Sequence, residues 1–215
     1  MIGQSIKVKD SCFSVKAFLG KGKSAYSYLI ENISAISEKY VLKQIHNEPC
    51  EYYQFGDKLE AEINSYYRLI NTGIKTPSLI EYNKHHKYLI KEYIEGQVAT
   101  SLIADSKIST DIFRQLFEVA GKAKQNNINL DYFPTNFIIS GQEMTYIDYE
   151  LNSYTDEWNL QNWGIFYWLN SAGMKEYLQT QNLLALNINL SSGKPIKAPF
   201  ENNVSELIRK FSIKY

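Results

Sequence analysis

The stretch DYFPTNFIISGQEMTYIDYE, residues 131–150, decides how the rest of this chain is interpreted. Two short apolar runs within it, 136–139 and 144–148, are separated by Ser-Gly-Gln and predict two strands joined by a tight turn. Asp131 precedes the first run, and Glu150 follows the second. Because the segment from Asp131 to Asn136 follows a predicted helix and precedes a strand, both of its polar ends can project into one cleft.

The polar residues of this stretch form a set with a specific chemistry. An aspartate such as Asp131 can orient a hydroxyl group, while the Asn136 amide oxygen and the Asp148 carboxylate suit Mg²⁺. Glu150 lies two residues further on the same side of the chain, where it can assist a second metal ion or brace the loop. Taken singly, each residue is also compatible with ordinary turn chemistry, since Asp, Asn and Pro punctuate loops.

A glycine-rich turn, Gly20-Lys-Gly22-Lys-Ser-Ala25, separates two predicted strands at 12–19 and 25–33. Glycines there let backbone N–H groups approach phosphate oxygens that a Cβ would obstruct. The alternative is an ordinary hairpin, because any hairpin can carry two glycines. The chain contains no G-x-x-x-x-G-K-[ST] motif, which excludes a P-loop NTPase.

Lys43 occupies an alternate position of an apolar strand predicted at 40–45. A lysine that points toward an apolar face needs an anionic partner, and the alternative is an edge-strand lysine in water. Glu62 is the candidate partner, because it lies on the apolar side of a helix predicted at 59–70. Glu60 is the competing choice and faces elsewhere on that helix.

The remaining pattern places strands early in the chain and helices late. Further strands are expected at 78–82 and 87–94. Ser109, Thr110 and Asp111 are candidate caps of a helix that carries an apolar stripe to Ala123. Residues after 150 read mainly as helices. This segregation predicts the α+β class.

The chain resembles the protein-kinase-like superfamily in the order of six features. These are the glycine-rich hairpin, the strand Lys, the helix Glu, a Glu92–Gly96 connector, D-x-x-x-x-N and I-D-x-E. The likeness is strongest to the small-molecule branch of choline and aminoglycoside kinases. Pro134 stands at the proline of their H-x-D-x-x-P-x-N loop, and residues 147–150 resemble their I-D-[FW]-E. The resemblance covers roughly residues 15–170.

The chain departs from the family pattern at two places. The loop His of the family is Asn129, and a later aspartate of the family is Asn159. Neither departure removes a residue of phosphoryl transfer, but both leave the acceptor open. Phe133 stands where protein kinases usually have a Lys, and no A-P-E segment follows, which argues against a protein kinase.

The resemblance implies a two-lobed protein-kinase-like fold, with an N-terminal antiparallel sheet and one helix in residues 1–94 and a mainly helical lobe in residues 95–215. It implies transfer of the γ-phosphoryl group of ATP to a hydroxyl, dependent on Mg²⁺. The implied catalytic residues are Asp131, Lys43 and Glu62. The implied nucleotide-binding residues are Gly20, Gly22, Ala25, Lys43, Glu92, Tyr93 and Ile94, and the implied metal ligands are Asn136, Asp148 and Glu150.

Charge is unevenly distributed along the chain. The 215 residues contain 23 basic and 23 acidic side chains, but residues 125–174 contain no Lys or Arg. A zero net charge excludes an all-basic surface for nucleic acid, and the 44% hydrophobic content excludes a disordered chain. No apolar run is long enough for a membrane span or a signal peptide, and the two cysteines, Cys12 and Cys50, read as reduced thiols. A cytoplasmic protein is expected, and the oligomeric state is left open.

The acceptor of the phosphoryl group has several candidates. Residues 125–174, called the acidic window below because they contain no Lys or Arg, include several Tyr and Trp residues. These rings can hold a cationic alcohol or amino sugar by cation–π contact, or they can be core residues. A small Ser/Thr protein kinase is one alternative to a small-molecule kinase. A nucleotide-binding pseudokinase module that acts through a partner is another. The role of residues 175–215 is left open.

Overall fold

The computed structural model describes residues 1–35, 38–48 and 56–212, so Cys50 lies outside the described residues. The chain divides into two compact units. Unit 1 comprises Met1–Tyr67 and Pro77–Ile94, and unit 2 comprises Arg68–Thr76 and Glu95–Tyr215. The turn after the first helix therefore groups with unit 2.

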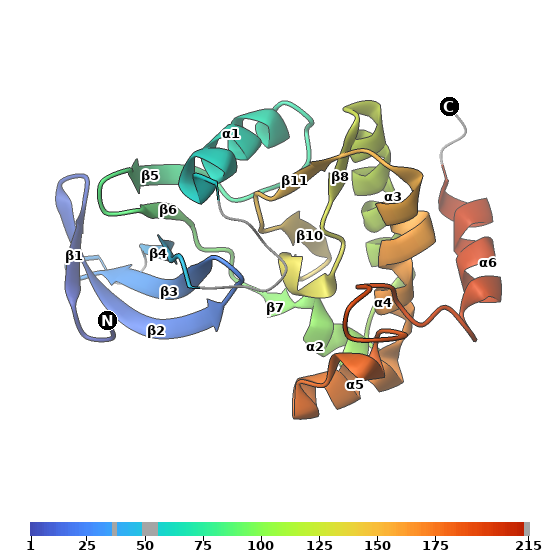
Figure 1. Cartoon of the computed structure of the whole chain (residues 1–215). Coiled ribbons are helices and arrows are strands. Elements are labelled where there is room, and N and C mark those ends of the chain that lie inside the picture. The colour runs from blue at the N-terminus through green and yellow to red at the C-terminus, as the bar shows by residue number, and fades with distance from the viewer. Residues whose placement is uncertain (36–37, 49–55, 213–215) are drawn as a thin grey trace. The chain divides into compact units, whose positions relative to one another are not determined.

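Unit 1 is built on an antiparallel sheet of six strands in the order β1-β2-β3-β4-β6-β5 (Figure 1). The strands are Ser5–Val8 (β1), Ser11–Lys21 (β2), Ala25–Asn32 (β3), Lys39–Ile45 (β4), Leu79–Asn83 (β5) and Tyr88–Glu92 (β6). Alternating apolar and β-branched residues in these segments favour strands. One face of the sheet carries a buried cluster of Val8, Phe13, Val15, Ile30, Leu42 and Ile90. The residues next to Leu42 and Ile90 in sequence point to the opposite face.

The first helix, α1 (Lys58–Ile70), begins and ends where the sequence predicts. Asp57 caps it by accepting a hydrogen bond from the Glu60 N–H at 3.2 Å. Leu59 and Ile63 are buried, and the helix stops at a turn whose Gly73 has a φ of +69°. Tyr67, on the same helix, is more than half exposed.

Unit 2 is mainly helical. Its helices are Ala99–Ala104 (α2), Thr110–Gln125 (α3), Ile165–Leu169 (α4), Ser171–Thr180 (α5) and Glu201–Phe211 (α6). Its strands are Gln97–Val98 (β7), Ile128–Leu130 (β8), Phe137–Ser140 (β9), Glu143–Tyr146 (β10) and Leu151–Ser153 (β11). Strands β9 and β10 pair antiparallel, and β7 joins them beside β9. Ser109 caps α3 as expected, accepting from the Ile112 N–H at 3.3 Å.

The α+β class, with an antiparallel sheet followed by a helix-rich remainder, is confirmed. The sequence did not predict β1 or the short strands β7, β8 and β11. These segments have two to four residues, too few to show an alternating pattern. Among the described residues, no helix has the length and apolar character needed to cross a membrane.

Candidate functional site

One face of the unit 1 sheet carries three of the residues expected to bind nucleotide, Gly20, Ala25 and Lys43. In the strand register, Gly20 is opposite Ser27, Ser27 is opposite Lys43, and Lys43 is opposite Leu89. Directly paired residues point to the same face of a sheet, so Gly20, Ser27 and Lys43 share one face. Ala25 is two residues before Ser27 and lies on that face as well. Ser27 was not predicted, because a serine in a strand carries no signal until the register is known.

The glycines of the hairpin are not explained by its backbone geometry. Neither Gly20 nor Gly22 has a φ in the left-handed region. A Cβ on Gly20 would meet nothing within 4 Å, and one on Gly22 would meet only the Ala25 carbonyl oxygen, at 3.6 Å. The turn closes through the Gly22 N–H, which donates to that oxygen at 2.8 Å. Turn and packing would therefore accept alanine at both positions, and the missing side chains leave open space beside the strand.

Lys43 forms a buried ion pair with α1. Its Nζ lies 2.8 Å from Glu62 Oε1, and the two side chains are 15% and 4% exposed. Glu62 Oε2 is buried without a hydrogen-bond partner among the described residues. Glu60, the competing choice, instead pairs with Lys84 on the surface at 2.6 Å. The pair fixes the Lys43 ammonium on the sheet face that carries Gly20, and it uses only Oε1 of the Glu62 carboxylate.

The end of β6 leads into the connector expected to contact adenine. The Glu92 N–H donates to the Ser78 carbonyl at 2.9 Å, and the Glu92 carboxylate accepts from the Ser78 N–H and hydroxyl at 3.1 Å each. Tyr93 and Ile94 follow outside the strand and are half-buried. The side chain of Glu92 is therefore bound to Ser78. The contact with adenine that is expected of Glu92, Tyr93 and Ile94 would be made by their backbone.

In unit 2, the loop from Asp131 to Asn136 is held by its own hydrogen bonds. Asp131 Oδ1 accepts from the Phe133 N–H at 3.0 Å, and Asn136 Nδ2 donates to the Asp131 carbonyl at 3.2 Å. The Asn136 N–H donates to the Phe133 carbonyl at 3.0 Å, closing a 3₁₀ turn that begins at Pro134. Because Asn136 Nδ2 donates to the Asp131 carbonyl, Oδ1 of the same amide points away from that carbonyl, where it can accept a hydrogen bond or bind a metal ion.

The structure brings this loop to the turn that carries Asp148. The Ile147 N–H donates to the Asn136 carbonyl at 2.8 Å, and Asp148 Oδ1 accepts from the Tyr149 N–H at 2.9 Å. No three His, Cys, Asp or Glu side chains within the described ranges are grouped closely enough to hold a metal ion. Mg²⁺ does not need such a cage, since it is usually bound by one or two carboxylates, waters and substrate phosphates. One carboxylate and one amide oxygen on adjoining loops fit that requirement.

Tyr146, which the sequence did not single out, lies at the centre of these loops. Its side chain is 1% exposed, and its hydroxyl donates to the Glu150 carbonyl at 3.1 Å. Burial raises the pKa of the Tyr146 phenol well above its usual value, and the charges of Asp148, Asp131 and Glu150 raise it further. In the sequence, Tyr146 was one more apolar position of a short strand.

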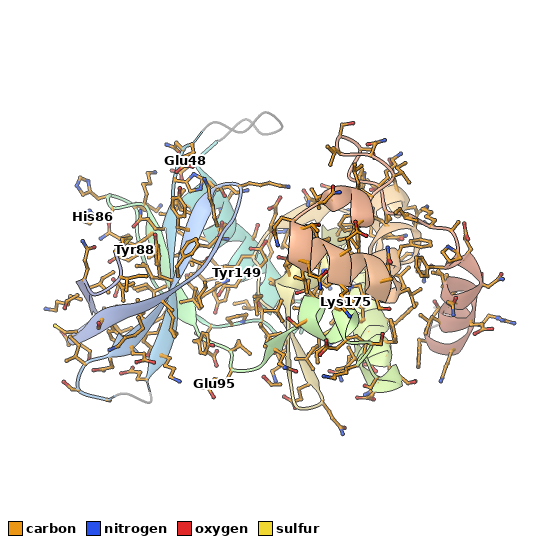
Figure 2. All side chains as sticks on the ribbon, turned by 90° about the horizontal axis from the view of Figure 1, so that it is seen from below. Glu48, His86, Tyr88, Glu95, Tyr149 and Lys175 are labelled. Carbon is orange, nitrogen blue, oxygen red and sulfur yellow. The ribbon has the colours of Figure 1, made fainter. Side chains whose placement is uncertain are left out.

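Most aromatic side chains of the acidic window are core residues. Tyr149 (labelled in Figure 2), Tyr167 and Trp168 are at most 2% exposed. The Trp168 Nε1–H donates to the Tyr132 carbonyl at 2.9 Å, behind Asp131. Of the two roles that the sequence left open for these rings, core packing is the one that these three have, because burial leaves them no ligand-accessible face. Trp158, 36% exposed, remains accessible.

The two departures from the family pattern have local structural roles. Asn129 is 2% exposed, and its Nδ2 donates to the Thr155 carbonyl at 2.9 Å. Asn159 caps the π-helical turn Leu160–Gly164, accepting from the Asn162 N–H at 2.8 Å.

Gly164 lets the helical segment before α4 approach the Asp131 loop, and we expect Gly164→Ala to destabilise the protein. A Cβ there would lie 2.3 Å from Tyr132 Cβ. Overpacking of this kind costs about 1–3 kcal/mol. Urea unfolding measures the loss, with Gly56→Ala as control because a Cβ on Gly56 would meet nothing within 4 Å. Equal stability of the two variants would contradict the close approach.

Comparison with known proteins adds a structural likeness. No family model matches the chain, and no curated protein matches its sequence. A chain in the structure of the CAK complex from Chaetomium thermophilum bound to ATP-gamma-S is similar, with a TM-score of 0.49 and 20% identity. The match covers 67% of this chain and 48% of that chain, so it spans about half of the compared protein.

Proposed function

We propose that this protein is an ATP- and Mg²⁺-dependent phosphotransferase of the protein-kinase-like superfamily that moves the γ-phosphoryl group to a hydroxyl. The observation that carries the proposal is the buried Lys43–Glu62 pair on the sheet face that also bears Gly20. A lysine held in this way by a helix glutamate is what phosphoryl transfer of the kinase type requires. Residues 1–94 would be the nucleotide-covering lobe, and residues 95–215 the catalytic lobe.

In the proposed nucleotide site, unit 1 supplies groups for each part of ATP. The Lys43 ammonium pairs with α- and β-phosphate oxygens, and the open space at Gly20 and Gly22 admits the phosphates to the hairpin backbone. The backbone of Glu92, Tyr93 and Ile94 offers hydrogen bonds to adenine. Ala25 contributes a small, buried side chain on the same face.

Unit 2 supplies the proposed acid–base and metal-binding groups. Asn136 and Asp148 would hold Mg²⁺, with Glu150 as a further oxygen donor, and bound Mg²⁺ would neutralise charge on the phosphates. The Asp131 carboxylate aligns the acceptor hydroxyl and accepts its proton as the new O–P bond forms, while the bond between the γ-phosphorus and the β–γ bridging oxygen breaks and ADP leaves. Its carboxylate is kept in place by the Phe133 N–H. Residues 125–174, which carry these carboxylates, contain no Lys or Arg.

A small hydroxyl compound, such as an amino alcohol, amino sugar or sugar, is the proposed acceptor. Phe133 supports it, because this half-buried ring contacts Tyr167 and Tyr177 and leaves no lysine two residues after Asp131. Transfer of labelled γ-phosphate separates the rival functions. Label on a small alcohol supports this acceptor, label on the chain itself supports a protein kinase, and binding without transfer supports a pseudokinase module. A cytoplasmic location is part of the same proposal.

Thermal melting with and without Mg-ATP tests nucleotide binding. Ligand at 100 times its dissociation constant stabilises the fold by about 2.7 kcal/mol, which raises the Tm by roughly 5–10 °C for a chain of this length. Asp148→Ala should lose the part of the shift that depends on Mg²⁺. The absence of any shift in the wild type at millimolar Mg-ATP would contradict the proposal.

A further inference from the structure

A small cavity opens beside α3, and its described lining belongs entirely to unit 2. Its volume is about 100 Å³, and the described lining includes none of the residues proposed for phosphoryl transfer. Tyr132 and Leu160, which are 1% and 0% exposed, supply part of its apolar lining. The residues of α3 that line it are three or four positions apart and so share one face of the helix: Phe117, Ala120, Gly121 and Lys124.

The cavity exists because α3 has small residues where this face meets it. Ala120 has one methyl group and Gly121 has no side chain, whereas Phe117 and Lys124 lie on either side of them. Glycine within a helix is less favourable than alanine, so helix stability does not explain Gly121. A leucine at position 120 would occupy part of the space. The hollow is therefore a feature that the helix maintains at some cost to its own stability.

The polar groups of the cavity favour an anionic head group. Among the lining residues that the structure describes, Lys124 is the only charged one, and it forms no ion pair with a described carboxylate. Its Nζ lies 5.6 Å from the centroid of the Tyr154 ring. The Ser212 oxygen accepts from Gln161 Nε2 at 2.9 Å, which leaves the Ser212 hydroxyl proton for another acceptor. A carboxylate suits both of these donors.

Asp156 is the acidic side chain that could oppose an anion here. It is not part of the described lining, and its Oδ1 accepts from the Tyr154 hydroxyl at 2.9 Å and from Asn159 Nδ2 at 3.3 Å. These two donors offset part of the charge of Asp156. Lys124 therefore sets the sign of the charge at the lining itself.

We propose that this cavity binds a small monocarboxylate whose apolar body is about the size of a phenyl ring. A closed apolar cavity of about 150 Å³ holds benzene. The present cavity, of about 100 Å³ and open to solvent, accepts most of such a ring and leaves the carboxylate at its mouth. The ring packs against Phe117, Tyr132 and Leu160. The carboxylate pairs with Lys124 and accepts from the Ser212 hydroxyl.

Titration of the full chain with sodium benzoate at constant ionic strength, followed by amide NMR, tests the site. Saturable shifts are expected in 117–124 and 159–161, with a Kd of about 1 mM or lower. Benzyl alcohol and benzylamine carry the same ring with a neutral and a cationic head group, and both should bind at least about tenfold more weakly. No saturable shift up to about 10 mM benzoate, or saturable shifts only outside these segments, would overturn the proposal. Equal affinity for benzylamine and benzoate would also overturn it.

Two variants separate the space from the charge. Ala120→Leu fills the cavity and should abolish binding of all three probes. Lys124→Met keeps a long side chain without its charge, so the affinity for benzoate should fall by about tenfold while that for benzyl alcohol changes by less than about twofold. A folded Ala120→Leu that still binds benzoate would overturn the proposal. If Ala120→Leu does not fold, Lys124→Met decides, and unchanged benzoate affinity in that variant would overturn the proposal.

Lys175→Met is the matched control for the loss of charge. Lys175 (labelled in Figure 2) is exposed on α5 and is not part of the described lining. This variant should bind benzoate as the wild type does. An equal loss of affinity in both lysine variants would show an effect of net charge and overturn the role of Lys124. The inference does not use the proposed function: a wild type that fails to bind Mg-ATP contradicts that function, and the benzoate titration still decides the cavity.

Discussion

Asp131→Asn is expected to lower turnover by roughly 10²–10⁴-fold while leaving Mg-ATP binding close to that of the wild type. Asparagine has the shape of aspartate, and its Oδ1 can still accept from the Phe133 N–H, which now lies at 3.0 Å. The loop should therefore keep its form. What is lost is the negative charge that aligns a hydroxyl and takes its proton. Single-turnover kinetics and a binding titration, done on the same preparation, measure the two effects separately.

Asp111→Asn is the control for this substitution. Asp111 lies on the surface of α3, 42% exposed, and pairs with Arg114 at 2.7 Å. Loss of one surface ion pair should change stability by less than about 1 kcal/mol and leave turnover unchanged. A loss of nucleotide binding in Asp131→Asn would mean that Asp131 serves the metal or the phosphates. Full turnover in that variant would remove Asp131 from the mechanism.

The parts of the candidate site that the sequence predicted are those set by local chemistry. Asp131 and Asn136 lie in one loop whose turn residues limit its conformation, and Asp148 follows the next strand. A short hairpin connects them, so neighbours in sequence stay neighbours in space. The Lys43–Glu62 contact was predictable for a different reason, since a lysine on an apolar face must find a carboxylate. These predictions use spacing and solvation alone.

Tyr146 and Ser27 required the structure, because their roles depend on register and on long-range contacts. A tyrosine in a short strand is apolar by pattern, and only the fold shows that its hydroxyl donates to the Glu150 carbonyl. Ser27 gains meaning from being opposite both Gly20 and Lys43. The aromatic residues of the window 125–174 needed the structure for the same reason. Composition allowed either a ligand surface or a core, and Tyr149 and Trp168 fill the core, because large rings stabilise a helical unit by burial.

Lys43→Met should have the second large effect, and it should appear in both activity and stability. Without the ammonium, the phosphates lose a fixed positive charge, which should lower kcat/KM by roughly 10²–10³-fold. The substitution also leaves Glu62, 4% exposed, as a buried carboxylate without its cation. Breaking one side of a buried pair in this way costs about 3–5 kcal/mol. Chemical denaturation and steady-state kinetics measure the two losses.

The double variant Lys43→Met with Glu62→Leu separates catalysis from folding. Replacing a buried ion pair by apolar residues of similar volume is often neutral or stabilising by about 1–4 kcal/mol, so the double variant should regain the stability that Lys43→Met loses. Turnover should stay low, because the phosphates still lack their lysine. A double variant that recovered turnover along with stability would show that the pair serves only the fold. A double variant that is stable but inactive would show that a hydrophobic contact holds α1 against β4 as well as the ion pair does. Phosphate binding by Lys43 would then be the reason for the ion pair.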